Sequence, residues 1–204
     1  ARDTQAYVDF FRRHWVRVVN MSFGGSVGGV EEQLEQCGIG ANADERRKIA
    51  REWFDIGKDA FVRAMASAPE VLFVAAAGNE NADSSFAESI PADIVLPNLI
   101  TVGAVDKAGD EAPFTSYGKT VVVHANGYLV DSVIPGGERL AESGTSMSAP
   151  QVTNLAAKIL AVNPALTPPQ VIAIIRETAE KTDDGRRVLI HPRKAIAAAQ
   201  AKQG

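Results

Sequence analysis

The chain has 204 residues, of which 46% are hydrophobic and 23% charged, as expected for one globular domain with a large buried core. Its 25 acidic and 21 basic residues give a formal charge of −4, and no segment gathers Lys and Arg into the basic patch that nucleic acid requires. The longest apolar run, Val71–Ala77, is far shorter than the roughly 20 residues that cross a bilayer, and the lone Cys37 permits no internal disulfide. We therefore expect no nucleic-acid partner and no membrane span.

The first third of the chain predicts helices around one buried strand. Aromatic residues at helical spacing indicate a helix over residues 4–15, and the β-branched run Val16–Met21 indicates a strand. Residues 24–29 lack the Gly-Lys-Ser/Thr ending of a phosphate loop, so we expect a flexible connector there. A long amphipathic helix is predicted to begin near Asn42 and to stop at Pro69.

The middle of the chain contains three apolar runs that do not alternate with polar residues, and these predict buried strands at Val71–Ala77, Leu99–Val105 and Thr120–His124. Continuous apolar strands separated by helices are typical of a parallel sheet covered on both faces. The expected fold class is therefore α/β, a three-layer αβα arrangement with a mainly parallel sheet.

The last third predicts a hairpin and then helices. Residues 128–134 indicate a short hairpin that ends at Pro135. Thr145–Val162 is apolar over most of a helix circumference, which predicts a buried helix. Further helices are expected after Thr167 and from about Pro192 to Ala201.

Ser146 lies at the predicted start of the buried helix, inside the segment Glu142–Pro150. Free backbone N–H groups and the positive end of the helix dipole meet there, which suits an attacking hydroxyl. Serine is equally a favoured helix cap, and Ser146 taken alone is read as a cap.

Two other segments have a functional interpretation beside a structural one. Asn79 follows the strand 71–77, where its amide could donate to an oxygen that gains negative charge, although Asn after Gly is also ordinary turn chemistry. The segment Val18–Gly25 is a strand that runs into glycines, whose backbone could pair with an extended peptide.

Together and in this order, the three segments resemble the C-terminal half of the subtilisin-like serine proteases, the subtilases (peptidase S8 family). Residues 20–25 are similar to the family's substrate-binding strand, residues 75–80 to its oxyanion-hole segment and residues 143–150 to the surroundings of its nucleophile. The resemblance covers nearly all of residues 1–204 and implies a partial subtilisin-like fold.

The resemblance also implies site residues. Ser146 matches the nucleophile of an acyl-enzyme mechanism, and Asn79 matches the side-chain oxyanion donor, with the Ser146 N–H as a second donor. The peptide bond before Pro91 is expected to be cis. The residues implied to bind the substrate backbone or the side chain before the scissile bond are Ser22, Phe23, Gly24, Ala76, Ala77, Gly78 and Ala92.

The base and carboxylate that activate such a serine are missing. Subtilases supply them from an Asp-Thr/Ser-Gly turn and a His-Gly-Thr helix start, and neither motif occurs here; His14, His124 and His191 lie outside the family's catalytic context. The chain also starts without methionine. We therefore expect half of a catalytic domain, inactive by itself, whose absent N-terminal half is its partner.

These observations lead to one function and one alternative. The expected function is that of a serine endopeptidase acting on protein or peptide substrates; the alternative is a peptide-binding or interaction module that lost its general base. An enlarged helical insertion is expected at about residues 26–70, with the role of a packed element or a partner surface. The absent half leaves the edge of Arg17–Met21 open, which predicts self-association.

No cofactor is expected. Calcium occurs in the family, but its ligands there come largely from backbone carbonyls and the missing half, so no metal is assigned to Asp83, Glu88 or Asp93. The family resemblance implies a secreted or cell-envelope location.

Overall fold

An interior strand of the main sheet, β3 (Leu72–Ala76), sends its side chains into two separate cores. Leu72, Val74 and Ala76 pack into one buried cluster, whereas Phe73 and Ala75 pack into another on the opposite face. The computed structural model describes residues 2–84, 86 and 88–202. A strand buried on both faces must be apolar at every position, which is why its sequence shows no alternation.

The main sheet has the strand order β1-β3-β5-β6-β10-β9, in which all neighbours are parallel except β10 and β9. Strand β1 is at one edge, with Val18 opposite Leu72 and Met21 opposite Ala75. The other strands of this sheet, beside β3, are β1 (Val18–Met21), β5 (Leu99–Val105), β6 (Val121–Asn126), β9 (Glu180–Lys181) and β10 (Val188–Leu189).

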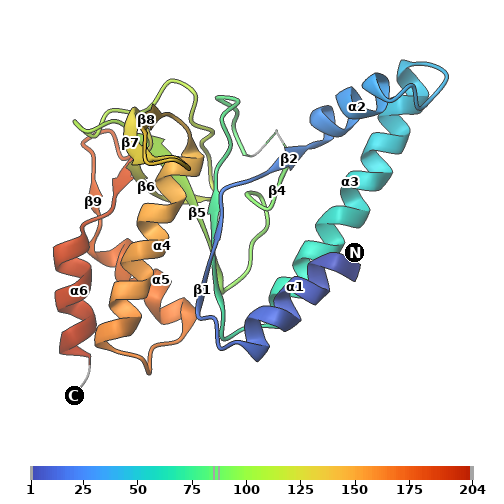
Figure 1. The fold of residues 1–204 in the computed structure, drawn as a ribbon. Coiled ribbons are helices and arrows are strands. Elements are labelled where there is room, and N and C mark those ends of the chain that lie inside the picture. Colours follow the sequence, from blue (N-terminus) through green and yellow to red (C-terminus); the bar gives the residue numbers. More distant parts are fainter. Residues whose placement is uncertain (1, 85, 87, 203–204) are drawn as a thin grey trace.

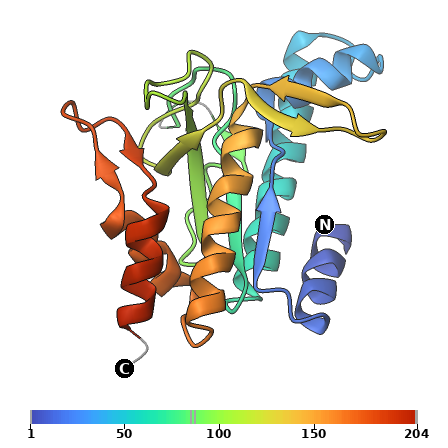
Figure 2. The ribbon, with the colours of Figure 1, turned by 60° about the vertical axis from the view of Figure 1, so that its left-hand side comes forward.

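Helices cover both faces of the sheet, so the expected three-layer α/β architecture is confirmed (Figures 1 and 2). One face carries α4 (Thr145–Val162), α5 (Pro168–Thr178) and α6 (Pro192–Ala201), and the other carries α1 (Arg2–Arg13) and α3 (Ala43–Ala66). No helix in the described part of the chain is both long and apolar enough to cross a bilayer.

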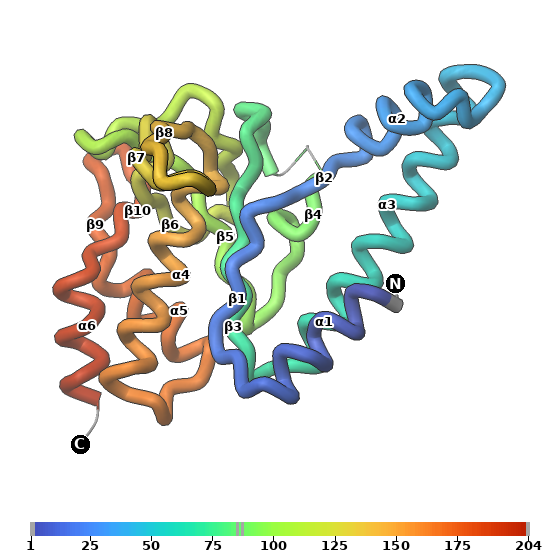
Figure 3. Tube along the Cα trace, viewed as in Figure 1, coloured from blue at the N-terminus to red at the C-terminus, as the bar shows by residue number. Residues whose placement is uncertain are grey.

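The segment after β1 forms an arm that projects from the body of the domain (Figure 3). The expected flexible connector at residues 24–29 is wrong, because Ser26 accepts a hydrogen bond from the Gly29 N–H and caps a helix, α2 (Val27–Gln36). Helix α2 packs on α3, which begins at Ala43 with Asn42 as its N-cap, close to the predicted start. The arm joins the body where β2 (Gly25–Ser26) pairs with β4 (Ser89–Ile90).

Two further expectations needed adjustment. The hairpin does not end at Pro135, because β7 (Val130–Val133) pairs with β8 (Arg139–Glu142) and Pro135 lies in the turn between them. The two-residue strands β9 and β10 were not expected. The peptide bond between Ile90 and Pro91 is cis, as the resemblance implied.

Candidate active site

Ser146 is the second residue of α4, and it does not cap the helix. The N-cap position belongs to Gly144, which makes no side-chain capping bond. The Ser146 hydroxyl instead donates to the carbonyl oxygen of Ser22, 3.3 Å away. The interpretation of Ser146 as a helix cap is therefore wrong, and its hydroxyl faces the segment that follows β1.

Asn79 stands beside Ser146 because the turn after β3 is tied to the first turn of α4. The Asn79 Oδ1 accepts hydrogen bonds from the Thr145 N–H and the Thr145 hydroxyl, both at 2.9 Å. The Gly78 N–H donates to the same hydroxyl at 3.1 Å. Gly78 has a φ of +107°, a backbone conformation that residues with a Cβ rarely adopt, so the turn favours glycine. These bonds orient the Asn79 carboxamide so that its NH2 group is left as a donor.

A small cavity of about 150 Å³ brings together residues from three segments of the chain. Ser146 and Asn79 line it with Ala76 and Gly78, and Phe23 and Gly24 form part of its wall. The backbone of Phe23 and Gly24 makes no hydrogen bond with another described residue, and the Phe23 side chain is exposed. This geometry offers a hydroxyl, an amide donor and an unpaired stretch of backbone around one hollow.

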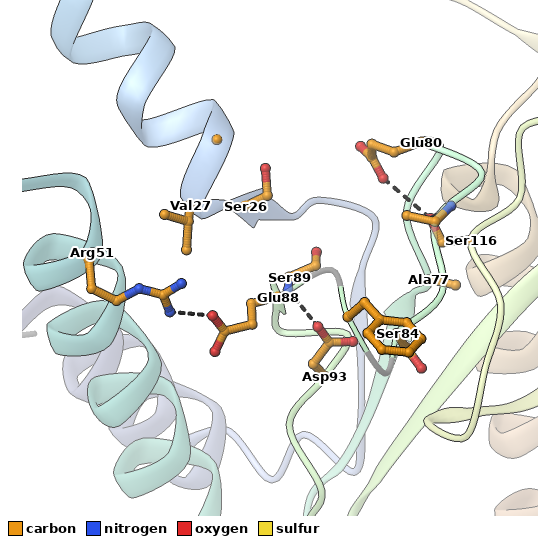
Figure 4. A pocket seen from close by; sticks show the side chains of 13 residues that line it. Ser26, Val27, Arg51, Ala77, Glu80, Ser84, Glu88, Ser89, Asp93 and Ser116 are labelled. Atoms are coloured by element: carbon orange, nitrogen blue, oxygen red, sulfur yellow. Dashed lines mark hydrogen bonds and ion pairs between the residues drawn. The ribbon is translucent and has the colours of Figure 1, made fainter. Parts of the chain in front are cut away.

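A second cavity of about 360 Å³ adjoins the first, and the two share Ser26, Glu80 and Ser89 (Figure 4). Ala77 lines this second cavity. Ala92 lines neither cavity: it is buried, and its carbonyl accepts a hydrogen bond from the Thr101 hydroxyl.

The second cavity is more acidic than its alanine and glycine walls alone would indicate. Among the described residues, Glu80, Glu88 and Asp93 line it with one cation, Arg51 of α3, while Lys58 lies 3.9 Å from Glu88. Arg51 forms a close ion pair with Glu88, and Figure 4 shows the guanidinium facing that carboxylate. Burial raises the pKa of Asp93, although its carboxylate accepts a hydrogen bond from the Ser89 N–H at 2.5 Å. The sequence contained one signal for this lining, since Glu80 directly follows Asn79.

None of the three histidines lines the cavity that contains Ser146. His124 is 4% exposed on β6, where its Nδ1 accepts a hydrogen bond from the Val188 N–H at 3.2 Å. Burial, and then the charge of Arg187, lower the pKa of His124 to about 4, so the imidazole is neutral at pH 7. His191 caps α6, and His14 follows α1 at the opposite end of β1 from Ser22. Within the described ranges, no imidazole or carboxylate forms a hydrogen bond with the Ser146 hydroxyl.

No metal centre emerges from the described residues, because no group of three or more His, Cys, Asp or Glu side chains converges among them. The site is bounded by β1, which pairs with β3 on one side only.

The model of the subtilase family (Peptidase_S8) matches residues 1–194. Among curated proteins, a subtilisin of Bacillus pumilus is 38% identical over 109 residues, covering 53% of this chain and 39% of that protein. The M-protease of Shouchella clausii is 31% identical over 164 residues, covering 80% of this chain and 42% of that protein. The chain thus spans about two fifths of the length of these relatives.

Two solved protease structures share the fold of this chain. A cold-adapted subtilisin-like serine proteinase superimposes with a TM-score of 0.68 at 27% identity, covering 92% of this chain and 60% of that chain. The prenylagaramide maturation protease PagA superimposes with a TM-score of 0.72 at 20% identity, covering 98% of this chain and 67% of that chain, a likeness that concerns the fold alone.

Proposed function

Because the chain belongs to the subtilase family of serine proteases, we propose that it carries the nucleophile, oxyanion hole and substrate pocket of an endopeptidase. The observation that supports this most strongly is that Ser146 and Asn79 line the same cavity. There, Thr145 donates two hydrogen bonds to the Asn79 carboxamide oxygen, which leaves the Asn79 NH2 group as a donor. The protein's substrates are protein or peptide chains in this proposal.

In the proposed reaction, the Ser146 hydroxyl oxygen attacks the carbonyl carbon of the scissile peptide bond. Its proton passes to a general base, and the carbonyl oxygen becomes an oxyanion. The Asn79 NH2 and the Ser146 N–H donate to that oxyanion, and neither has an acceptor among the described residues. The C–N bond then breaks, the base gives its proton to the leaving amine, and water hydrolyses the acyl-enzyme.

The substrate is proposed to lie in extended form along residues 22–24. Phe23 and Gly24 have unpaired backbone that suits strand addition, and this segment lies directly beside the nucleophile. The side chain before the scissile bond would then enter the second cavity, past Ala76, Ala77 and Gly78. In this proposal Ala92 does not contact the substrate; it is buried and only supports the pocket.

The general base and its carboxylate are proposed to come from outside residues 1–204. A neutral serine hydroxyl is a weak nucleophile without a base, and His124 is ill suited because its Nδ1 is occupied and it is buried on β6. We propose that the completing segment pairs with the open edge of β1, which ends beside Ser22 and Ser146. Without that segment, the same edge would favour self-association. The proposal includes the secreted location that the family resemblance implies.

The test compares peptide hydrolysis by the isolated chain with hydrolysis by a completed catalytic domain, in which an upstream segment supplies the base and the carboxylate. Hydrolysis only by the completed domain, abolished by Ser146→Ala, supports the proposal. Peptide binding without hydrolysis by the completed domain would favour the alternative, a peptide-binding module that lost its chemistry.

A further inference from the structure

The carbonyl of the proposed nucleophile lacks its usual partner in helix α4. In an α-helix, each carbonyl accepts a hydrogen bond from the N–H four residues later. For Ser146 that residue is Pro150, which lies inside α4 and has no N–H. The helix therefore cannot supply the usual i+4 donor to the Ser146 carbonyl.

Ser22 supplies the missing donor from the neighbouring strand. Its hydroxyl donates to the Ser146 carbonyl oxygen at 2.7 Å, the usual length of a well-formed O–H···O bond. In return, the Ser146 hydroxyl donates to the Ser22 carbonyl at 3.3 Å. The two serines are thus joined at two points, although 124 residues separate them in the chain.

Asn20 determines which way the Ser22 hydroxyl points. The Asn20 Nδ2 donates to the Ser22 Oγ at 2.9 Å, so the single proton of that hydroxyl must point elsewhere, and the Ser146 carbonyl is where it goes. The Asn20 Oδ1 lies 3.2 Å from the Thr153 hydroxyl, whose proton is shared with the Ala149 carbonyl at 3.0 Å, and the Asn20 NH2 points toward Ser22. Thr153 lies two turns further along α4 than Ser146, so the chain of bonds begins and ends on one helix.

We propose that Asn20 is a positioning residue for Ser146, acting through Ser22. The relay from Thr153 through Asn20 to Ser22 replaces the hydrogen bond that Pro150 removes, and it holds the first turn of α4 against β1. The role as a positioning residue for catalysis rests on the proposed function, whereas the relay itself is a property of the isolated chain. Asn20 touches neither the substrate cavity nor the reacting atoms.

The relay can be measured at one atom. Ser146–Met147 is the only Ser–Met dipeptide in the sequence, so labelling with carbonyl-¹³C serine and ¹⁵N methionine gives a single correlated NMR signal, from the Ser146 carbonyl. A carbonyl carbon resonance moves upfield when its oxygen loses a hydrogen bond. The signal therefore reports directly on the bond from Ser22.

The informative variants are Asn20→Asp and Asn20→Ala. A carboxylate at position 20 can only accept hydrogen bonds, so it draws the Ser22 hydroxyl proton away from the Ser146 carbonyl. With alanine at position 20, that proton can still be donated to the Ser146 carbonyl. We expect Asn20→Asp to move the Ser146 carbonyl signal upfield, nearly as far as Ser22→Ala does, and Asn20→Ala to move it less. A residue that serves packing alone gives the reverse order, because alanine removes more of the side chain.

Asn154→Asp is the matched control, since it makes the same chemical change at an exposed neighbour of Thr153 on α4 and is expected to leave the signal in place. An unchanged signal in Asn20→Asp, or a larger shift in Asn20→Ala than in Asn20→Asp, overturns the relay. Failure of the proposed function appears differently, as absence of hydrolysis by the completed wild-type domain, and leaves the order of the shifts intact.

Discussion

The carboxamide oxygen of Asn79 accepts hydrogen bonds from both the backbone N–H and the hydroxyl of Thr145, each at 2.9 Å. Thr145 directly precedes Ser146, so one residue both anchors the amide and begins the helix of the proposed nucleophile. This contact brings two distant segments of the sequence together in one site. The Asn79 amide oxygen then has a structural role, and the NH2 group is left to bind the substrate.

In the completed domain, Asn79→Ala is expected to lower kcat by about 10²–10³-fold with little change in KM, a loss for which subtilisin itself is the reference case. Asn79→Asp keeps an acceptor for Thr145 but has no NH2 donor, so we expect a similar loss of kcat without loss of folding stability. Steady-state kinetics and thermal unfolding check this. Near-wild-type kcat in Asn79→Asp would show that the amide NH2 does not bind the oxyanion.

Arg51→Ala is expected to shift the substrate preference of the completed domain toward Lys or Arg before the scissile bond. Arg51 is the one cation among the described residues that line the acidic cavity. Its removal leaves Glu80 and Asp93, with Glu88 paired to Lys58 at 3.9 Å, to attract a basic side chain. The ratio of kcat/KM for Lys and Leu substrates should rise about two- to five-fold, corresponding to the ~0.5–1 kcal/mol of a partly exposed ion pair. Arg47→Ala is the control, because Arg47 pairs with Asp44 on the same helix outside the cavity. An equal change in both variants would refute a role for the cavity in this preference.

His124 is expected to make the isolated chain sensitive to mild acid. Its pKa in the folded chain is lowered from 6.5 to about 4, so between these values the unfolded chain binds a proton that the folded chain does not. The free energy of unfolding therefore falls as the pH drops through this window, by up to about 1.4 kcal/mol per pH unit from this residue.

His124→Asn, whose Oδ1 can accept from the Val188 N–H in place of Nδ1, should reduce this dependence. Urea unfolding at pH 7, 6 and 5 measures it, and the exposed His14→Asn serves as the control. Equal pH slopes in wild type and His124→Asn would contradict the expectation.

Trp15→Asn is expected to reduce self-association of the isolated chain. The Trp15 side chain is 87% exposed beside the start of β1, and its φ of +55° is a conformation that Asn adopts more readily. Light scattering over a dilution series, with hydrogen exchange of residues 18–21, measures association through this edge. Trp53→Gln removes the other tryptophan, on the arm, and should leave association unchanged. A wild-type monomer at every concentration, with rapidly exchanging β1 amides, would rule out the open edge as an interface.

The elements that could be predicted from the sequence are those whose burial leaves a pattern. β5 and α4 were predicted with the bounds that the structure shows, because apolar residues run without interruption in one and cover most of the circumference in the other. Helix α2 was missed because Gly28 and Gly29 disfavour a helix, and its stability depends on the Ser26 cap and on the burial of Leu34 as α2 packs on α3.

The acidic cavity could not be predicted because long-range pairing creates it. Ser26 and Ser89 meet in the β2–β4 ladder, which brings Glu88 and Asp93 against the beginning of the arm. No sequence pattern near Glu88 predicts that its ion-pair partner is Arg51 of α3. Likewise, the relay through Asn20 depends on contacts between β1 and α4, more than a hundred residues apart in the chain.

The most direct measurement is the rate at which a fluorophosphonate probe acylates Ser146, followed by mass spectrometry of the modified peptide. The isolated chain should react very slowly, because the Ser146 hydroxyl donates to a backbone carbonyl and to no imidazole or carboxylate among the described residues. The completed domain should react faster by orders of magnitude. Ser146→Ala should abolish labelling of that peptide in both. Rapid labelling of Ser146 in the isolated chain, or equal rates in the two proteins, would contradict a nucleophile whose base lies outside these residues.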